Sequence, residues 1–274
     1  MRTTPSAASL YVPRFNVMDP DEVRPFVDAV ATAQLVTVGE DGVPDATFLP
    51  VLWEGDRLVG HLARANGHWR RIVDGSPALA IVTGPDTYVS PSWYASKAEH
   101  GKVVPTWNYS VVHLRGRVMV HDDASWVRDL VTRLTDRHEQ PRDEPWAVSD
   151  APDDYVTKNL RPIVGVELVV SSVEAKAKLS QNRSDEDRAG VARGLADDEA
   201  YAAGAAHAGD ATGEAFAHAG HGATSPSGSR PSATRPAATP ARSSSERFWL
   251  SLALASTESM TSLTPTMGRR FLST

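Results

Sequence analysis

The sequence predicts a protein made mainly of β-strands with flanking helices, an α+β fold in which the strands form a barrel or a sandwich. Short β-rich runs separated by tight turns follow one another over residues 34–90, as in all-β architectures. Over residues 112–120, hydrophobic side chains alternate with histidine and arginine, which is the period of a half-buried strand. Residues 163–170 form a run that is apolar except for Glu167, as expected of a central strand. These signals together indicate a sheet-based core.

A helix and a three-stranded meander are expected first along the chain. Asp19, Pro20 and Glu22 supply an N-cap, a proline at the first helical position and the glutamate of a capping box, so a helix begins here. Turns that contain Gly42 and Gly55 then separate three β-rich runs. The expected strands are residues 34–38, 45–53 and 57–62.

Further strands and helices follow. Apolar residues at helical spacing predict a helix over residues 124–138, and a second one over residues 152–160 ends before Pro162. Gly116 lies inside a strand and predicts a bulge or a close backbone approach. Ser184 can cap another helix. The expected strands are residues 78–83, 87–90, 111–120, 163–170 and 173–179.

Composition limits the classes of function. Of the 274 residues, 41% are hydrophobic, which suffices for a sizeable core. The absence of cysteine excludes disulfides, thiolate metal sites and cysteine nucleophiles. A net charge of −6 argues against a broadly basic nucleic-acid surface. The N-terminus lacks the apolar run of a signal peptide and no apolar run reaches the length of a membrane span, so we expect a cytoplasmic protein.

The composition changes near residue 201. Residues 203–245 are rich in alanine, glycine, serine, threonine and proline and nearly lack large apolar side chains. Such a segment cannot bury enough surface to offset the entropy of ordering. We therefore expect one domain over residues 1–200 and a disordered tail over residues 201–274. The scattered histidines of this tail specify no ligand geometry, and no metal site is expected.

Three polar and aromatic stretches are candidates for a ligand site. Residues 90–94 and 105–109 combine aromatic rings with hydroxyl groups, as where an apolar wall meets a polar ligand; the alternative is that these rings belong to the core. Residues 61–71 place histidines, arginines and an asparagine at the end of a strand and the start of a helix. Such a place can bind an anion, and the alternative is a solvated basic helix start.

Several sequence blocks in a fixed order give the chain a family resemblance. LYVPRFNV, HLARANGHWR, SPSWY, VPTWNY, IVGVELVV and KLSQNR begin at residues 10, 61, 90, 104, 163 and 178. In this order they closely resemble the PaiB family of FMN-binding negative transcriptional regulators, over about residues 10–195. The resemblance implies the split β-barrel of the pyridoxamine-phosphate-oxidase-like flavoproteins. It also implies a homodimer with FMN at the subunit interface.

The resemblance implies roles for particular residues. The FMN phosphate is expected at His61, Arg64 and Asn66 with Trp69 or Arg70. Backbone groups of the strand Thr47 to Val51 are expected along the flavin ring. An aromatic wall from Trp93, Trp107 or Tyr109 is expected for the ring, and donors near its pyrimidine edge from Ser90, Ser92, Thr106 and Asn108. Within the KLSQNR block, Lys178, Ser180, Gln181 and Arg183 are expected near the flavin or substrate pocket.

Two classes of function stay open. The resemblance favours an FMN-binding regulator that represses transcription by binding DNA or through a regulatory protein partner, although no helix-turn-helix with a basic recognition helix is visible in the sequence. The alternative is an FMN-dependent oxidoreductase or redox sensor that acts on a small-molecule substrate. Haem bound at the same barrel through His61, His68 or His113 is a weaker alternative. No catalytic constellation is recognisable, so no catalytic residue is assigned.

Overall fold

The computed structural model describes residues 10–197. The tail expected to be disordered, residues 201–274, lies outside the described residues. Contacts divide the described chain into two compact units, residues 10–88 with 106–182 and residues 89–105 with 183–197. Each unit is described by itself. None of the helices in the described part of the chain is long and apolar enough to cross a membrane.

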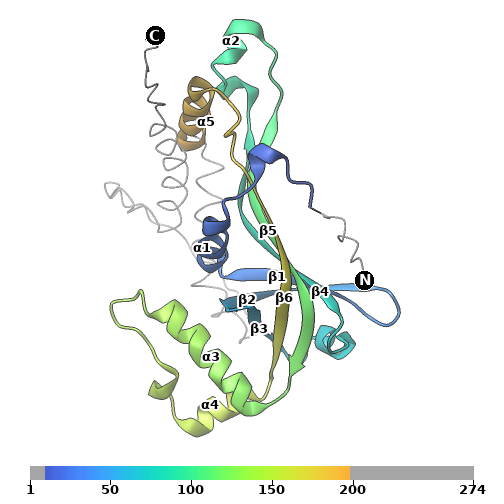
Figure 1. Ribbon diagram of the computed structural model, residues 1–274. Helices are drawn as coiled ribbons and strands as arrows, with labels where there is room; N and C mark the ends of the chain where they lie inside the picture. Colours follow the sequence, from blue (N-terminus) through green and yellow to red (C-terminus); the bar gives the residue numbers. More distant parts are fainter. Residues whose placement is uncertain (1–9, 198–274) are drawn as a thin grey trace, which may run out of the picture. The chain divides into compact units, whose positions relative to one another are not determined.

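The first unit is a closed six-stranded barrel with the strand order β1-β2-β3-β6-β5-β4 (Figure 1). Neighbouring strands pair antiparallel at the β1–β2, β1–β4, β2–β3, β3–β6 and β5–β6 contacts. This arrangement confirms the predicted barrel. The strands are β1 (Thr32–Val38), β2 (Pro44–Glu54), β3 (Arg57–Ala63), β4 (Pro77–Val89), β5 (Thr106–His121) and β6 (Ile163–Lys178).

Three strands, β4, β5 and β6, are longer than the sequence pattern predicted. β5 begins at Thr106, whereas the pattern placed its start at residue 111. β4 runs unbroken through Gly84 and Pro85, where the sequence suggested two strands; a proline is compatible with a strand wherever the ladder does not need its missing N–H. β6 likewise continues through Ser171 and Ser172. These serines are exposed, so the apolar signal stops while the backbone pairing goes on. β5 and β6 therefore form one long antiparallel pair, which we call the β5–β6 hairpin although the helical segment of residues 122–162 joins its two strands.

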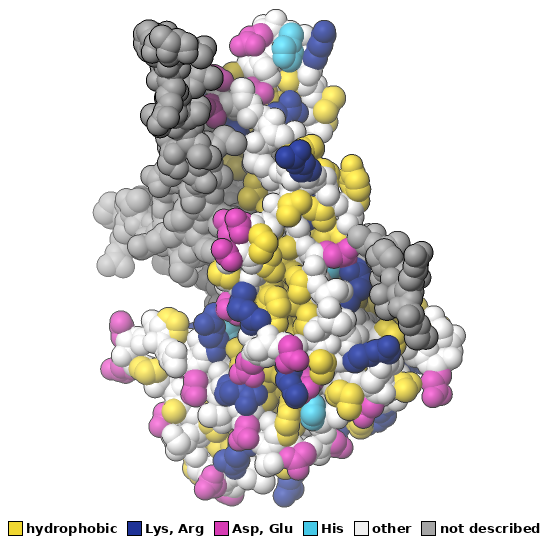
Figure 2. All heavy atoms as spheres, in the orientation of Figure 1, with side chains coloured by type: hydrophobic (Ala, Val, Ile, Leu, Met, Phe, Trp, Pro, Cys, Tyr) yellow, Lys and Arg dark blue, Asp and Glu magenta, His cyan; other side chains and the backbone are white. Residues whose placement is uncertain are grey.

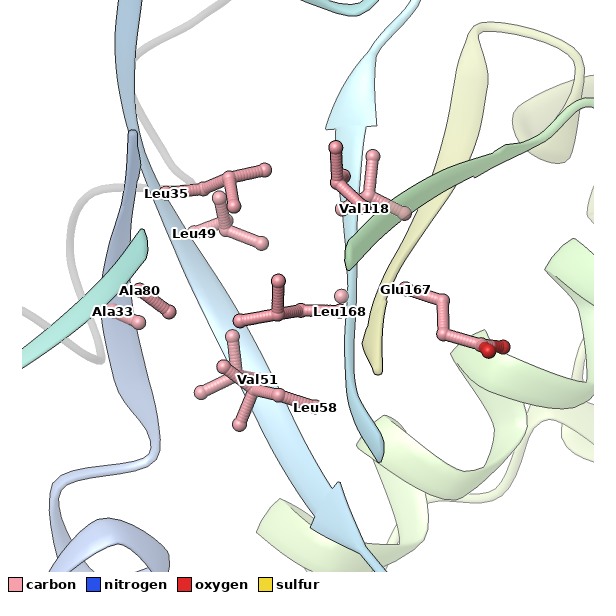
Figure 3. A pocket seen from close by; sticks show the side chains of 11 residues that line it. Ala33, Leu35, Leu49, Val51, Leu58, Ala80, Val118, Glu167 and Leu168 are labelled. Carbon is pink, nitrogen blue, oxygen red and sulfur yellow. The ribbon is translucent and has the colours of Figure 1, made fainter. Parts of the chain in front are cut away.

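Aliphatic side chains fill the interior of the barrel (Figure 3). The free space among them is about 10 Å³, roughly what one water molecule needs. Figure 3 shows that the side chain of Glu167 points away from this interior. A flavin therefore has to bind outside the barrel. The labelled residues that line the interior are Ala33, Leu35, Leu49, Val51, Leu58, Ala80, Val118 and Leu168.

The predicted bulge lies at Gly116. The register between β5 and β6 shifts between Arg115 and Gly116. A Cβ atom on Gly116 would lie 1.9 Å from the backbone oxygen of Val169, so only glycine allows this close approach. On either side, Leu114 and Val118 are fully buried, as the alternating pattern predicted.

Helices cover parts of the barrel. α1 (Pro20–Val30) begins as predicted, because the Asp19 side chain accepts a hydrogen bond from the backbone N–H of Asp21. α3 (Ala124–Glu139) packs Leu130 and Leu134 against Val59 of β3. The other helical elements of this unit are η1 (Arg14–Asn16), η2 (Gly67–Arg71), η4 (Val148–Asp150) and α4 (Asp153–Leu160).

The indole of Trp126 fixes α3 on the sheet. His61, Gly165 and His121 form a row across β3, β6 and β5. The Trp126 ring stacks on His121 with the centroids 4.0 Å apart. It also lies where a side chain of Gly165 would be, because a Cβ atom there would be 2.0 Å from Cζ3 of the indole. Because Gly165 has no side chain, the indole of Trp126 can pack directly against the sheet at this position.

The second unit contains η3 (Pro91–Trp93), α2 (Ser96–His100) and α5 (Asp185–Asp197). Ser184 caps α5 as predicted, because its hydroxyl accepts a hydrogen bond from the backbone N–H of Asp187. Gly190 and Gly194 receive Trp93, since a Cβ atom at these positions would lie 2.0 Å from its backbone oxygen and 2.3 Å from its indole. Glycine at two adjacent turns lets this helix approach the tryptophan closely.

Candidate functional site

A buried polar network joins η2 to the barrel strands. His68 is 5% exposed. Its Nε2 lies 2.8 Å from the Thr37 hydroxyl and its Nδ1 lies 2.7 Å from the Thr47 hydroxyl. Asn66 donates to Thr47 Oγ1 at 3.1 Å and accepts from the backbone N–H of His68 at 3.0 Å. Two of the predicted site residues, Thr47 and Asn66, thus lie together.

The hydrogen bonds of this network suit the neutral form of the His68 ring. Burial lowers the pKa of His68 below its usual value, so its ring is neutral at neutral pH. A neutral imidazole has one donor and one acceptor nitrogen, and the two threonine hydroxyls satisfy both. The predicted FMN site did not include Thr37 or His68; His68 was named only as an alternative haem ligand. A polar Thr37 on the same face of the strand as the apolar Ala33 and Leu35 was the signal available in the sequence.

Most arginines near η2 are bound to carboxylates. Both terminal nitrogens of Arg64 donate to Asp122, and its Nε donates to the backbone oxygen of Arg161 at 2.9 Å. These bonds hold the pKa of Asp122 below its ordinary value. Arg71 donates to Asp45 at 2.6 Å and to Asp41 at 2.8 Å. The structure therefore uses Arg64 and Arg71 to tie segments of the barrel together.

Arg70 is different from these arginines. Its side chain is exposed and lies over Trp69, with the guanidinium carbon 4.6 Å from the ring centroid. Among the described residues it has no ion pair. Trp69 is itself held in place, because its Nε1 donates to the backbone oxygen of Arg64 at 2.9 Å. The guanidinium of Arg70 is therefore held against Trp69 and can still bind an anion.

His61 lies on another face of the barrel from this network. It shares the outer face of β3 with Val59, which packs under α3, and it pairs with Gly165 below Trp126. Burial lowers the pKa of His61. Its Nδ1 is buried and has no hydrogen-bond partner among the described residues. The structure thus separates His61 from Asn66 and Arg70.

A second polar cluster lies where the β5–β6 hairpin opens. The Lys178 ammonium donates to the hydroxyl of Thr106 and to the backbone oxygen of Trp107, the latter at 2.9 Å. Ser180 donates to Asn108 Oδ1 at 3.0 Å, and both residues are buried. The cluster joins the predicted residues Thr106, Trp107, Asn108, Lys178, Ser180 and Gln181, the last of which accepts from the backbone N–H of Leu179.

The two clusters lie at opposite ends of the hairpin. Arg64 is bonded to Asp122, just after β5, whereas Lys178 is bonded to Thr106, at the start of β5. β5 has 16 residues, which span roughly 50 Å when extended at about 3.3 Å per residue. Within one chain, a single flavin cannot touch both clusters.

Four further predicted residues, Ser90, Ser92, Trp93 and Arg183, belong to the second unit. The Ser90 hydroxyl accepts from the backbone N–H of Ser92 at 3.2 Å, and Lys97 donates to the Ser92 hydroxyl at 3.1 Å. Trp93 packs against Gly190 and Gly194 of α5. The guanidinium of Arg183 lies 4.5 Å from the ring centroid of Tyr94. Within this unit these side chains contact one another and α5.

Comparison with known proteins identifies the family. The family model described as "Putative FMN-binding domain" matches residues 10–172. "Protease synthase and sporulation protein PAI 2" of Bacillus subtilis is 32% identical over 195 residues, which cover 69% of this chain and 91% of that protein. An uncharacterized protein of Emericella nidulans is 29% identical over 50% of this chain and 65% of its own length. A crystal structure of a conserved hypothetical protein of Mycobacterium tuberculosis has a TM-score of 0.47 at 14% identity, and covers 64% of this chain and 94% of its own. The chain therefore belongs to the PaiB family of FMN-binding domains, as its sequence blocks indicated.

Proposed function

We propose that this protein binds FMN on the outside of the barrel, with the phosphate at Arg70, and acts as a regulatory flavoprotein. Membership of the family supports FMN as the ligand. The filled barrel interior leaves only outer surfaces for the cofactor. The observation that carries the placement is that Arg70, alone among Arg64, Arg70 and Arg71, has no carboxylate partner among the described residues.

The residues around Arg70 suit the phosphate end of FMN. A guanidinium binds phosphate through two parallel N–H donors, and Trp69 holds that of Arg70 at a fixed place. Asn66 holds the start of η2 through its bonds to Thr47 and His68. When bound, FMN supplies redox chemistry. The chain's part is to bind and orient it.

We place the flavin ring against a second subunit. The cluster of Thr106, Trp107 and Lys178 is too far from Arg70 within one chain to share its ligand. Trp107 is 52% exposed, and an exposed tryptophan is a suitable wall for a flat aromatic ring. We propose a symmetric dimer in which Trp107 of one subunit lies beside Arg70 of the other. The implied homodimer is thus what makes the two clusters one site.

The proposed regulatory role acts through a partner. The relative in Bacillus subtilis is named a protease synthase and sporulation protein, and we take this name as support for a regulatory role. Direct binding to DNA needs clustered free arginines and lysines. Most described arginines with ordered partners are instead neutralised by carboxylates. Those in ion pairs are Arg57, Arg64, Arg71, Arg115, Arg128, Arg133, Arg142 and Arg188.

Titration of FMN into the wild type and into Arg70→Met tests the placement. The variant keeps the length of the side chain and removes the charge. Since a hydrogen bond to a charged group contributes about 1.5–3 kcal/mol, we expect the Kd for FMN, measured by flavin fluorescence, to rise at least about tenfold. Lys158→Met, an exposed cation on α4, is the control and should bind as the wild type does. Equal affinity of Arg70→Met and the wild type would refute the placement.

A further inference from the structure

Lys176 is a buried cation without a counter-charge. It lies on the outer face of β6, the face opposite to the buried side chains of Val112 and Leu114, and is 8% exposed. Its Nζ lies 5.1 Å from the ring centroid of Tyr109 and 5.8 Å from that of Tyr11. It forms no hydrogen bond or ion pair with any residue that the structure describes. Its backbone neighbours on the two sides are Val111 of β5 and Val17.

The charged neighbours of Lys176 on the same face of β6 are engaged with other residues. Glu174, two residues before it on the same face, is paired with Arg115. Lys178, two residues after it, donates to Thr106 and Trp107. His113 lies opposite Glu174, and burial is the main cause that lowers its pKa. The Arg115–Glu174 pair is neutral, so this face carries an uncompensated positive charge.

Burial of such a cation is unfavourable unless an anion pairs with it. Removing an ammonium from water is costly when no acceptor replaces the lost hydration. Contacts with tyrosine rings compensate only in part. The ring of Tyr11 is 78% exposed, and Phe15 and Val17 beside it are also exposed. The positive charge of Lys176 thus lies next to apolar and aromatic side chains that are exposed to solvent.

We propose that Lys176 anchors a second ligand site, which takes a small organic anion. Its carboxylate or phosphate group would pair with the ammonium, and its apolar part would lie against the rings of Tyr11 and Tyr109. In Figure 2, hydrophobic side chains gather along the β5–β6 hairpin, while charged ones are frequent over α3 and α4. The distance along β6 from Ile163, which accepts from Arg64, to Lys176 is roughly 43 Å. The site is therefore far from Arg70 of the same chain. It neighbours Lys178, two residues along β6, whose ammonium is bonded to Thr106 and Trp107 of the cluster that we assign to the flavin ring, so the two ligands would occupy adjacent sites.

Thermal unfolding with chosen probes tests this site. Benzoate and phenyl phosphate supply the anion with an aromatic part, benzamide supplies the ring without charge, and inorganic phosphate supplies the charge without the ring. Because a ligand that binds only the folded state stabilises it, we expect benzoate, phenyl phosphate or both to raise the melting temperature of the wild type in proportion to the logarithm of their concentration. Which of the two acts distinguishes a carboxylate from a phosphate ligand. Benzamide and inorganic phosphate should have little effect.

The variants make the outcome specific. Lys176→Met should lose the shift, and Lys158→Met should keep it. If Lys176→Met does not fold, Tyr11→Ala removes an exposed ring and should weaken the shift. The proposal is wrong if neither anion stabilises the wild type at millimolar concentration, or if Lys176→Met responds as the wild type does.

A parallel FMN titration separates this site from the flavin site. Lys176→Met should bind FMN with unchanged affinity, while Arg70→Met should lose FMN and keep the response to the anion. If saturating FMN abolishes the anion-dependent shift in the wild type, Lys176 belongs to the flavin site and the second site does not exist. Failure of FMN to bind would leave the anion result intact, so the two proposals fail independently.

Discussion

Arg64 and Arg70 lie six positions apart and have the same side chain, but the structure gives them different surroundings. The carboxylate of Asp122 neutralises Arg64, while Arg70 rests on Trp69 with no ion pair to a described residue. The sequence could predict that residues 61–71 carry donors. It could not predict which donors are already used, because Asp122 lies 58 positions away in the chain. Partners of this kind become visible only when the strands are brought together.

His68 gives a prediction at the residue scale. Its pKa is lowered in the folded protein by burial, whereas the unfolded chain has the ordinary value of about 6.5. Below pH 6.5 the unfolded state therefore binds more protons than the folded state. The contribution of His68 to the free energy of unfolding is fully present above pH 6.5. It is lost as the pH falls towards the pKa of the folded state, by at most about 1.4 kcal/mol per pH unit for one histidine.

Urea unfolding of the wild type and His68→Gln between pH 7.5 and 5 measures this effect. Glutamine keeps a donor and an acceptor near Thr37 and Thr47 but does not titrate, so we expect a smaller loss of stability with falling pH in the variant. His61 and His113 also have pKa values lowered by burial and should preserve part of the slope. His138→Gln, at an exposed position on α3, is the control. If the free energy of unfolding falls with pH as steeply in His68→Gln as in the wild type, protonation of His68 is not coupled to folding.

At the scale of elements, local sequence signals predicted where most helices and strands begin. The caps at Asp19 and Ser184 and the bulge at Gly116 depend on side chains next to each other in the chain or on a glycine, and the structure confirms them. The continuation of β4 and β6 was missed. Backbone pairing across the barrel extends these strands past Pro85 and past the exposed Ser171 and Ser172, and hydrophobic alternation does not report such pairing.

Gly165→Ala is the prediction for the contact between α3 and the sheet. A methyl group there would lie 2.0 Å from Cζ3 and 2.5 Å from Cε3 of Trp126, so the indole has to move. Overpacking of this kind costs about 1–3 kcal/mol, and we expect a loss of that size in the free energy of unfolding in urea. Gly67→Ala is the matched control, because no atom lies within 4 Å of the added methyl group. Equal stability of the two variants would contradict the role assigned to Trp126.

At the scale of the whole molecule, the predicted site residues divide into separate groups. Asn66 and Arg70 lie at one end of the β5–β6 hairpin, Trp107 and Lys178 at the other, and Ser92 belongs to the second unit. The resemblance indicated which residues to expect at the site. It could not indicate that one chain keeps them apart, since this follows from the length and the direction of the strands. A site shared between two subunits is the consequence that we propose.

A dimer of two different subunits tests the shared site. Arg70→Met and Trp107→Ala, each expressed alone, should bind FMN poorly. When one subunit carries Arg70→Met and the other Trp107→Ala, one of the two shared sites has both native residues, so we expect about one FMN per purified heterodimer. If each site lies within a single chain, both sites of the heterodimer are defective and no binding returns. Light scattering gives the subunit count, and a monomer at working concentration would also contradict the account.

The absorbance spectrum of the purified protein, before and after titration with FMN, tests the central claim most directly. We predict the bands of oxidised flavin, either present at purification or gained on titration, with saturation at about one FMN per subunit. That result would make reduction and reoxidation of the flavin the next property to compare with regulation. A protein that takes up no FMN, or that shows a Soret band in its place, would contradict the claim that this barrel is a flavin site.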